Sequence, residues 1–269
     1  MSSSGRVTVD KSLGEGCFDI LTSIAARTFH NWLDIPATSW SHKTMALWKN
    51  DEELFELARH ELFTAVVGDV LDTMGLLKQF LPPSIKPLDD SMVVIGRAMT
   101  VLEEDREQVD EDPGKNAFGL MFDALDNLRA NEVYVCSGAS PTYALWGGLM
   151  STRAMRLGAV GAVMDGYSRD TPEIRALGFP TFSLGTYAQD QGPRGQVVDY
   201  RSPIDFGGIT IASGDLVYGD LDGVLIIPAN AVEEAFTGAF EKARGEQHVR
   251  KALEEGMPAK DAFEKFGIM

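Results

Sequence analysis

The chain has 269 residues, of which 44% are hydrophobic, and it carries a formal net charge of −16 at pH 7. This length fits one large domain or a domain with an extension, and the hydrophobic share permits a sizeable core. The negative charge argues against nucleic acid and anionic membranes as partners, because both favour lysine and arginine. We expect a cytoplasmic globular protein: the N-terminal residues lack the continuous apolar stretch of a secretory signal, and no apolar run reaches the ~18 residues of a transmembrane helix.

Residues 1–50 are interpreted as an N-terminal extension. They contain three of the four tryptophans but show weak periodicity: Trp32, Trp40 and Trp48. Because exposed tryptophan is unfavourable, this segment is expected to pack onto the core or onto a neighbouring subunit. The alternative on composition alone is a partly ordered tail.

The next segments change from helical to strand periodicity. Leucine spacing predicts a helix over Glu53–Leu62 with Asp51 as its N-cap, and a second helix over Gly68–Gly75. Residues Met92–Val101 are typical of a strand, in which Gly96 marks a bulge or a close approach.

Seven of the ten residues from 103 to 112 are acidic. This run favours a solvated loop, with a metal-collecting lid as the alternative.

Helices and strands alternate in the middle of the chain, and strands dominate after Gly195. The expected helices are Phe118–Leu128, Tyr143–Leu157, Thr171–Leu177, a tail from Ala229 to Glu255, and Asp261–Phe266. The expected strands are Glu132–Cys136, Ala159–Met164, Thr181–Leu184, Gln196–Tyr200, Gly208–Ala212, Leu216–Tyr218 and Gly223–Pro228. We expect Cys136, in the first of these strands, to be a reduced, buried thiol. The order predicts a layered α/β domain with a mixed sheet. No dinucleotide-binding or P-loop glycine pattern is present.

The most informative segment runs from Gly161 to Pro180. An apolar strand ends in a turn that delivers Arg169 and Asp170 where a helix begins. Asp170 and Glu173 have the spacing of a capping box, which is one interpretation; a metal ligand is the other. The planar guanidinium of Arg169 suits a carboxylate or an oxyanion. Because no lysine or histidine occurs from residue 116 to 241, chemistry in this core must use carboxylates, arginine, backbone amides or a bound metal.

A glycine pair, Gly147 and Gly148, stands near the start of a predicted helix. Glycines at a helix start leave amides open to an anion, with the helix dipole behind them. Alternatively, the pair permits close helix packing. The sequence favours neither interpretation.

Four segments in this order and spacing resemble the RraA-like superfamily: 146–150, 161–170, 178–180 and 214–224. That family includes class II pyruvate aldolases acting on 4-hydroxy-4-methyl-2-oxoglutarate and 4-carboxy-4-hydroxy-2-oxoadipate, and also the ribonuclease E regulator. The resemblance covers roughly residues 52 to 267. It implies a swivelling β/β/α sandwich over residues 51–229, a helical tail over 230–269 that contacts a neighbouring subunit, and homotrimers or homohexamers with active sites between subunits.

The resemblance also implies roles for individual residues. Arg169 would bind the pyruvyl oxygen and stabilise the enolate, and Asp170 would hold Mg²⁺ or Mn²⁺. An acidic residue on a neighbour's C-terminal helix would complete the metal's water shell, and Glu246 matches best, with Glu241 as a fallback. The substrate carboxylate would be bound at the glycine motif, by Gly147, Gly148, Leu149 and Met150. The aldolases carry an acid where this chain has Gly148, so the cation would have one carboxylate fewer.

The expected chemistry is cleavage of a 4-hydroxy-2-oxo acid, which leaves a pyruvate enolate. The nearest lysines, Lys115 and Lys242, lie in polar segments, so a Schiff base is not expected. A hard divalent cation beside arginine is the other electron sink, and decarboxylation of oxaloacetate gives the same enolate. The hypothesis for the proton acceptor is a metal-bound water held by Asp170. The alternative function is a non-catalytic regulator of ribonuclease activity that binds a basic protein partner.

Overall fold

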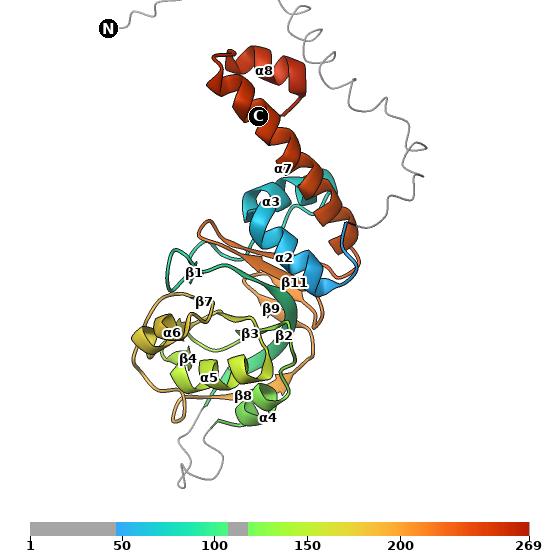
Figure 1. Ribbon diagram of the computed structural model, residues 1–269. Helices are drawn as coiled ribbons and strands as arrows, with labels where there is room; N and C mark the ends of the chain where they lie inside the picture. Colours follow the sequence, from blue (N-terminus) through green and yellow to red (C-terminus); the bar gives the residue numbers. More distant parts are fainter. Residues whose placement is uncertain (1–46, 107–117, 269) are drawn as a thin grey trace, which may run out of the picture. The chain divides into compact units, whose positions relative to one another are not determined.

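A computed structural model describes residues 47–106 and 118–268 of the chain. Most of the expected N-terminal extension (residues 1–46, with Trp32 and Trp40) and residues 107–112 of the acidic run lie outside the described residues. The described residues form one compact unit around an eight-stranded mixed sheet (Figure 1). Within these residues, no helix is both long enough and apolar enough to cross a membrane.

The sheet has the strand order β1-β7-β5-β3-β2-β11-β12. Strand β8 pairs with the C-terminal end of β2, residues 101–105. Its strands are β1 (Lys86–Pro87), β2 (Val94–Asp105), β3 (Glu132–Ser137), β5 (Gly161–Met164), β7 (Thr181–Ser183), β8 (Gly195–Tyr200), β11 (Leu216–Gly219) and β12 (Val224–Ile227). Two small sheets pair β4 (Ala144–Trp146) with β6 (Tyr167–Ser168), and β9 (Ile204–Phe206) with β10 (Ile209–Ile211). The helices are α2 (Asp51–Glu61), α3 (Thr64–Thr73), α4 (Met121–Asp126), α5 (Gly148–Leu157), α6 (Thr171–Leu177), α7 (Val232–Glu254) and α8 (Ala259–Phe266).

The centre of the sheet is parallel. Strands β2, β3, β5 and β7 run in the same direction, and β1, β8, β11 and β12 pair antiparallel at its margins. The central strands β3 and β5 are buried almost throughout, which explains their continuous apolar sequences. Parallel strands need crossover connections, and α4, α5 and α6 fall between β2 and β7 in the chain. The expectation of a mixed α/β sheet is confirmed.

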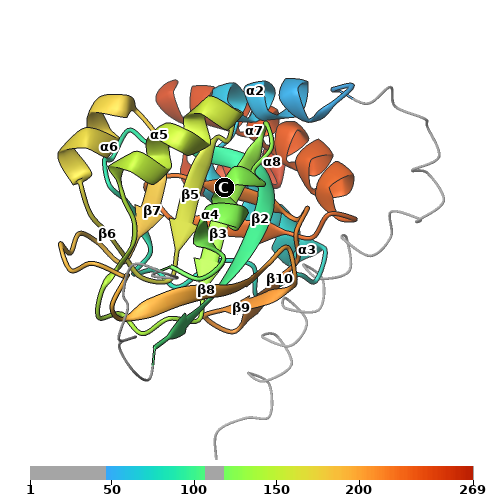
Figure 2. The same ribbon diagram turned by 90° about the horizontal axis from the view of Figure 1, so that it is seen from below.

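Two buried clusters hold the helices to the sheet. One lies between the parallel strands and the group α4, α5 and α6; the other joins α2, α3 and the first half of α7 to β11 and β12. Figure 2 shows these two helix groups on different sides of the strands. Trp48 contacts Phe240 of α7, with ring centroids 5.9 Å apart. The aromatic side chain of Trp48, predicted to belong to the extension, therefore packs on the described core.

The sequence located most of the longer elements to within a few residues, but it missed strands β1, β6 and β9 and was wrong at other points. The helix expected over Tyr143–Leu157 is wrong, because residues 144–146 form strand β4 and α5 begins only at Gly148. Helix α2 is capped by Asn50, which accepts from the amide of Glu53, while Asp51 lies inside the helix and pairs with Arg97. Residues 103–105 belong to β2 and not to a solvated loop, and Glu103 is fully buried.

The structure confirms the close approach of neighbouring atoms that was predicted at Gly96. A Cβ atom at this position would lie 2.7 Å from the carbonyl oxygen of Asn131 and 2.5 Å from a methyl carbon of Val160. The buried, free thiol predicted at Cys136 is also confirmed, on β3.

Candidate active site

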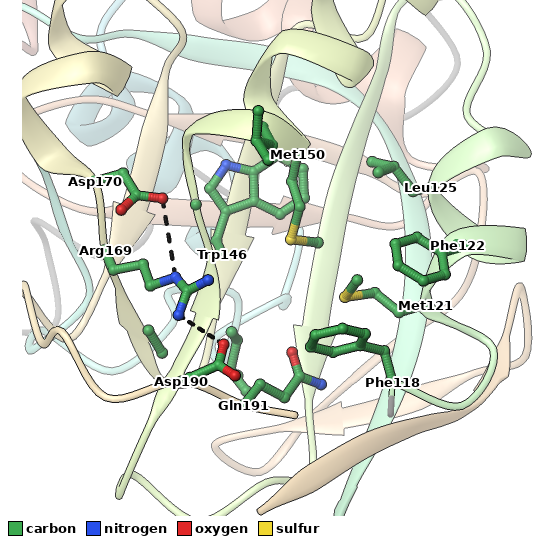
Figure 3. Close-up of a pocket in the computed structure, with 14 residues that line it drawn as sticks. Phe118, Met121, Phe122, Leu125, Trp146, Met150, Arg169, Asp170, Asp190 and Gln191 are labelled. Carbon is green, nitrogen blue, oxygen red and sulfur yellow. Dashed lines mark hydrogen bonds and ion pairs between the residues drawn. The ribbon is translucent and has the colours of Figure 1, made fainter. Parts of the chain in front are cut away.

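A pocket of about 340 Å³ lies where the start of α5 meets the turn after β6. One end carries Arg169, Asp170 and Asp190, and the other is formed by residues of α4 and the segment before it (Figure 3). The fourteen lining residues are Phe118, Met121, Phe122, Leu125, Ala144, Leu145, Trp146, Gly147, Leu149, Met150, Arg169, Asp170, Asp190 and Gln191. The glycine motif and the arginine–aspartate pair, predicted to act together, therefore line one cavity.

The pairing of β4 with β6 brings these two motifs together. Trp146 lies opposite Ser168 in this parallel pair, and its carbonyl accepts from the amide of Arg169 at 2.9 Å. The Trp146 ring is buried, and its indole N–H donates to Ser151 Oγ at 2.7 Å, one turn into α5. The start of α5 and the backbone of Arg169 are thus fixed to one buried side chain.

Asp170 has an unusual backbone and does not cap α6 in the predicted way. Its φ of 57° and ψ of 33° lie in the left-handed region, which aspartate tolerates better than most residues. Its side chain makes no hydrogen bond to the first turn of α6; instead Oδ2 accepts from the amide of Gly148 at 3.1 Å. The capping-box interpretation is therefore wrong, because the turn directs this carboxylate to the start of α5. Strained conformations of this kind concentrate at functional sites.

The glycine pair makes room for two carboxylates. A Cβ atom at position 147 would lie 2.8 Å from Asp170 Oδ2, and one at position 148 would lie 2.2 Å from Glu173 Oε2. Both oxygens thus stand against the positive end of the α5 dipole, where anions are stabilised. The amide of Gly148 is already bonded to Asp170, and the geometry of a helix start leaves the next amides, those of Leu149 and Met150, without acceptors inside the helix.

Arg169 is held by a residue that the sequence did not single out. Its Nη1 donates to Asp190 Oδ1 at 2.6 Å, and its Nε lies 3.9 Å from Asp170 Oδ2. The side chain is 38% exposed. Asp190 belongs to the connection between β7 and β8, which has no periodic pattern, so nothing in the sequence marked it. The guanidinium has five N–H donors, more than these contacts use.

A buried carboxyl group lies behind the pocket. Gln191, which lines the pocket, donates its amide N–H to Glu103 Oε2 at 2.6 Å, while Glu103 Oε1 is buried without a hydrogen-bond partner among the described residues. Burial raises the pKa of Glu103 to about 8, and the hydrogen bond from Gln191 opposes this only in part. The carboxyl group of Glu103 is therefore mostly protonated at neutral pH.

Glu246 does not line this pocket. It lies on α7, where Oε1 is 4.0 Å from Lys242 Nζ, and it lines a separate hollow with Glu61, Phe63 and Arg250. Glu241 is exposed on the same helix. Any contact of Glu246 with the pocket therefore needs a second copy of the chain, as the resemblance implies.

The carboxylate oxygens at the start of α5 are suitable ligands for a cation that keeps much of its water. In residues 47–106 and 118–268 no three His, Cys, Asp or Glu side chains are grouped to hold a metal. Asp170 and Glu173 supply carboxylate oxygens, and no histidine or cysteine lines the pocket. Mg²⁺ binds through one or two carboxylates and retains several waters, whereas zinc prefers nitrogen and sulfur ligands. The chain's own residues thus fit Mg²⁺ or Mn²⁺ better than zinc.

Comparison with known proteins identifies the family. A family model described as RraA-like (Aldolase/RraA) matches residues 64–226. The chain belongs to the RraA-like family. The matched residues include the glycine pair, Arg169, Asp170 and Glu173. The resemblance of the four sequence segments and the expected RraA-like sandwich fold are confirmed.

Individual relatives show the same likeness. A Halalkalibacterium halodurans protein named "Putative 4-hydroxy-4-methyl-2-oxoglutarate aldolase" is 30% identical over 74% of this chain and 89% of its own length. Protein DlpA of Legionella pneumophila is 28% identical over 76% of this chain, which spans only 32% of DlpA. The crystal structure of Streptomyces coelicolor RraAS2, from the RNase ES inhibitor RraA family, aligns with a TM-score of 0.64 and 26% identity, covering 76% of this chain and 98% of that one.

Proposed function

We propose that the protein is a carbon–carbon lyase, a class II aldolase that cleaves a 4-hydroxy-2-oxo acid to pyruvate and a second carbonyl compound. The observation that carries this proposal is the meeting of Arg169, Asp170 and the start of α5 in one pocket. The aldolase names among the relatives support the reaction class.

The pyruvyl end of the substrate would lie between α5 and Arg169. Its carboxylate would accept from the first-turn amides of Leu149 and Met150, where the helix dipole favours an anion. The 2-oxo oxygen would face Arg169, whose guanidinium stabilises negative charge that develops there during bond cleavage. Asp190 would act as a positioning residue, because its 2.6 Å contact holds the guanidinium at the pocket.

Asp170 would hold the divalent cation, Mg²⁺ or Mn²⁺, and Glu173, whose carboxylate also lies at the start of α5, would be the second acidic group beside it. Bound there, the cation would supply an electron sink beside the 2-oxo group and the carboxylate. Glu246 of a neighbouring subunit would complete the water shell, so assembly as a homotrimer or homohexamer is part of this proposal.

The reaction needs one proton acceptor and one proton donor. Removal of the 4-hydroxyl proton allows the C3–C4 bond to break, and its electron pair moves into the enolate at C2 and C3. A water held by Asp170 remains the expected acceptor, and Asp190, which also lines the pocket, is the alternative. Protonation of C3 then gives pyruvate. Loss of CO₂ from oxaloacetate produces the same enolate, so decarboxylation is expected as a second activity.

The test is pyruvate release from 4-hydroxy-4-methyl-2-oxoglutarate and from oxaloacetate, with Mg²⁺ and with excess chelator. Arg169→Gln should lower kcat about 100- to 1000-fold, as expected for loss of an oxyanion-stabilising donor. Arg153→Gln is the matched control, because Arg153 is also a half-exposed arginine in an ion pair but does not line the pocket. Absence of metal-dependent turnover on every 2-oxo acid tried would refute the proposal.

The second candidate function is regulation of a ribonuclease by protein–protein binding. The likeness to the Streptomyces coelicolor RraAS2 structure favours it, and the net charge of −16 suits a basic partner. Salt-dependent binding to a ribonuclease E-type enzyme, unchanged in Arg169→Gln and without turnover of any 2-oxo acid, would support this function over the lyase.

A further inference from the structure

The pocket end opposite Arg169 is almost entirely apolar. Figure 3 shows Arg169, Asp170 and Asp190 on one side, and the α4 side chains on the other, with Trp146 and Met150 between them. The apolar end is formed by Phe118, Met121, Phe122 and Leu125, which we call the α4 wall. The rings of Phe118 and Phe122 meet edge to face with centroids 5.6 Å apart. This arrangement makes the wall a continuous apolar surface.

Among the described residues, the side chains of the α4 wall offer no partner for a charged group. Its four side chains carry no hydrogen-bond donor, and the backbone amide of Met121 already donates to the carbonyl of Phe118. The side-chain amide of Gln191, beside the wall, donates one of its two N–H groups to Glu103. A carboxylate placed against these side chains would lose its water without gaining a hydrogen bond from them, which is strongly unfavourable.

The charged side chains that line the pocket also argue against a second carboxylate on the substrate. Among the described lining residues Arg169 is the single cationic side chain, and it is already paired with Asp190. The other carboxylate of the lining is Asp170. A substrate with one carboxylate at the α5 end can be accommodated, whereas a second carboxylate at the α4 wall would meet no cationic side chain among the residues that the structure describes.

We propose that the substrate of this lyase carries an apolar group at C4, an alkyl chain or an aromatic ring, and no second carboxylate. This inference rests on the proposed function, because that function places the pyruvyl end at Arg169 and hence the C4 group at the α4 wall. The cavity volume of about 340 Å³ has room for a ring or a branched chain beyond the pyruvyl unit. The substrate named for the relatives, 4-hydroxy-4-methyl-2-oxoglutarate, ends instead in a second carboxylate.

The experiment compares two substrates that release pyruvate by the same step. One is 4-hydroxy-2-oxo-4-phenylbutanoate, with an apolar C4 group; the other is 4-hydroxy-4-methyl-2-oxoglutarate. Both are assayed with Mg²⁺, and exchange of the pyruvate methyl protons in D₂O is measured as a reaction that needs no C4 group. We expect kcat/KM at least tenfold higher for the apolar substrate. Equal or higher kcat/KM for the dicarboxylate, with methyl exchange present, would overturn this inference and leave the lyase proposal standing. Absence of methyl exchange and of both cleavages would overturn both.

A charge placed on the α4 wall gives the second test. Phe122 is 61% exposed, so Phe122→Lys should fold, and it should shift the kcat/KM ratio at least tenfold toward the dicarboxylate. Phe263→Lys is the matched control, because Phe263 of α8 is 54% exposed and does not line the pocket. An unchanged ratio in Phe122→Lys, accompanied by an altered oligomeric mass in light scattering, would assign the wall to a subunit contact and overturn the inference.

Discussion

Substitution of Asp170 separates its structural role from its chemical role. The carboxylate accepts a hydrogen bond from the amide of Gly148, and the backbone lies in the left-handed region. Asparagine keeps an acceptor oxygen and tolerates the same backbone, but it removes the charge. Alanine loses both the acceptor and the preference for this conformation. The two variants should therefore differ in stability and agree in activity.

The magnitudes follow from these contacts. The Asp170 side chain is 45% exposed, so loss of its bond to the start of α5 costs about 1 kcal/mol, as for other helix N-cap residues. A left-handed conformation without a polar side chain adds a penalty of at most about 1 kcal/mol. We expect Asp170→Ala to lose about 1–2 kcal/mol, which lowers Tm by about 2–8 °C for a protein of this size, and Asp170→Asn to lose under about 0.5 kcal/mol.

Two measurements check this prediction. Thermal unfolding in chelator gives the stability of each variant, and the rise in Tm with added Mg²⁺ reports cation binding without turnover. The wild type should gain stability with Mg²⁺, whereas both variants should lose this gain together with metal-dependent pyruvate release. If Asp170→Asn retains both responses, the role of this carboxylate in metal binding is refuted. If it unfolds as readily as Asp170→Ala, the account of the Gly148 contact is wrong.

Three further predictions follow from neighbouring contacts. Gly148→Asp should cost at most about 1 kcal/mol, because its Cβ would lie 2.2 Å from the Glu173 carboxylate but the exposed Glu173 side chain can move aside. Adding Glu173→Ala should recover most of this loss, and additive effects in a double-mutant cycle of unfolding free energies would contradict the contact. The pKa of Glu103, about 8 in the folded protein against 4.5 for a free side chain, gives stability at acidic pH that is lost as pH rises toward 8. Glu103→Gln should therefore unfold at a higher temperature than the wild type at pH of about 8.5, with a smaller advantage near pH 5, whereas equal differences at both pH values would contradict burial as the cause. Finally, inactive Glu246→Ala and Arg169→Ala proteins should regain activity when mixed under conditions of subunit exchange, and no recovery would count against a shared site.

Local sequence patterns predicted several elements around the site, but they did not predict strands β4 and β6, whose pairing brings the two motifs together. Helix α6 was located at the observed residues, and strands β3, β5 and β7 to within one or two residues, because buried parallel strands have continuous apolar sequences bounded by turns. The glycine pair and Arg169 were singled out because their residue types have few structural roles at such positions. These signals are local, so one sequence is enough to detect them.

Contacts between distant segments were not predictable in the same way. The capping-box spacing of Asp170 is genuine, but the left-handed turn aims its side chain at the amide of Gly148, 22 residues earlier in the chain. Likewise, the partner of Arg169 lies 21 residues further on, at Asp190, in a segment without periodicity. The burial of Glu103 was missed because its acidic neighbours indicated a loop, while the end of β2 runs beside β8. Each error came from tertiary structure overriding a local pattern.

Gly148 is the position at which the chain departs from the aldolase pattern that the resemblance implies. The resemblance leads us to expect an acid where this chain has Gly148, and its absence implied a missing group beside the cation. In the structure the space that a side chain at position 148 would enter is filled by Glu173, which reaches back from the first turn of α6. The glycine and the glutamate are therefore mutually dependent, because a side chain at 148 would displace the carboxylate from the start of α5. Two carboxylates still stand at this helix start, so the glycine does not by itself argue against a cation there.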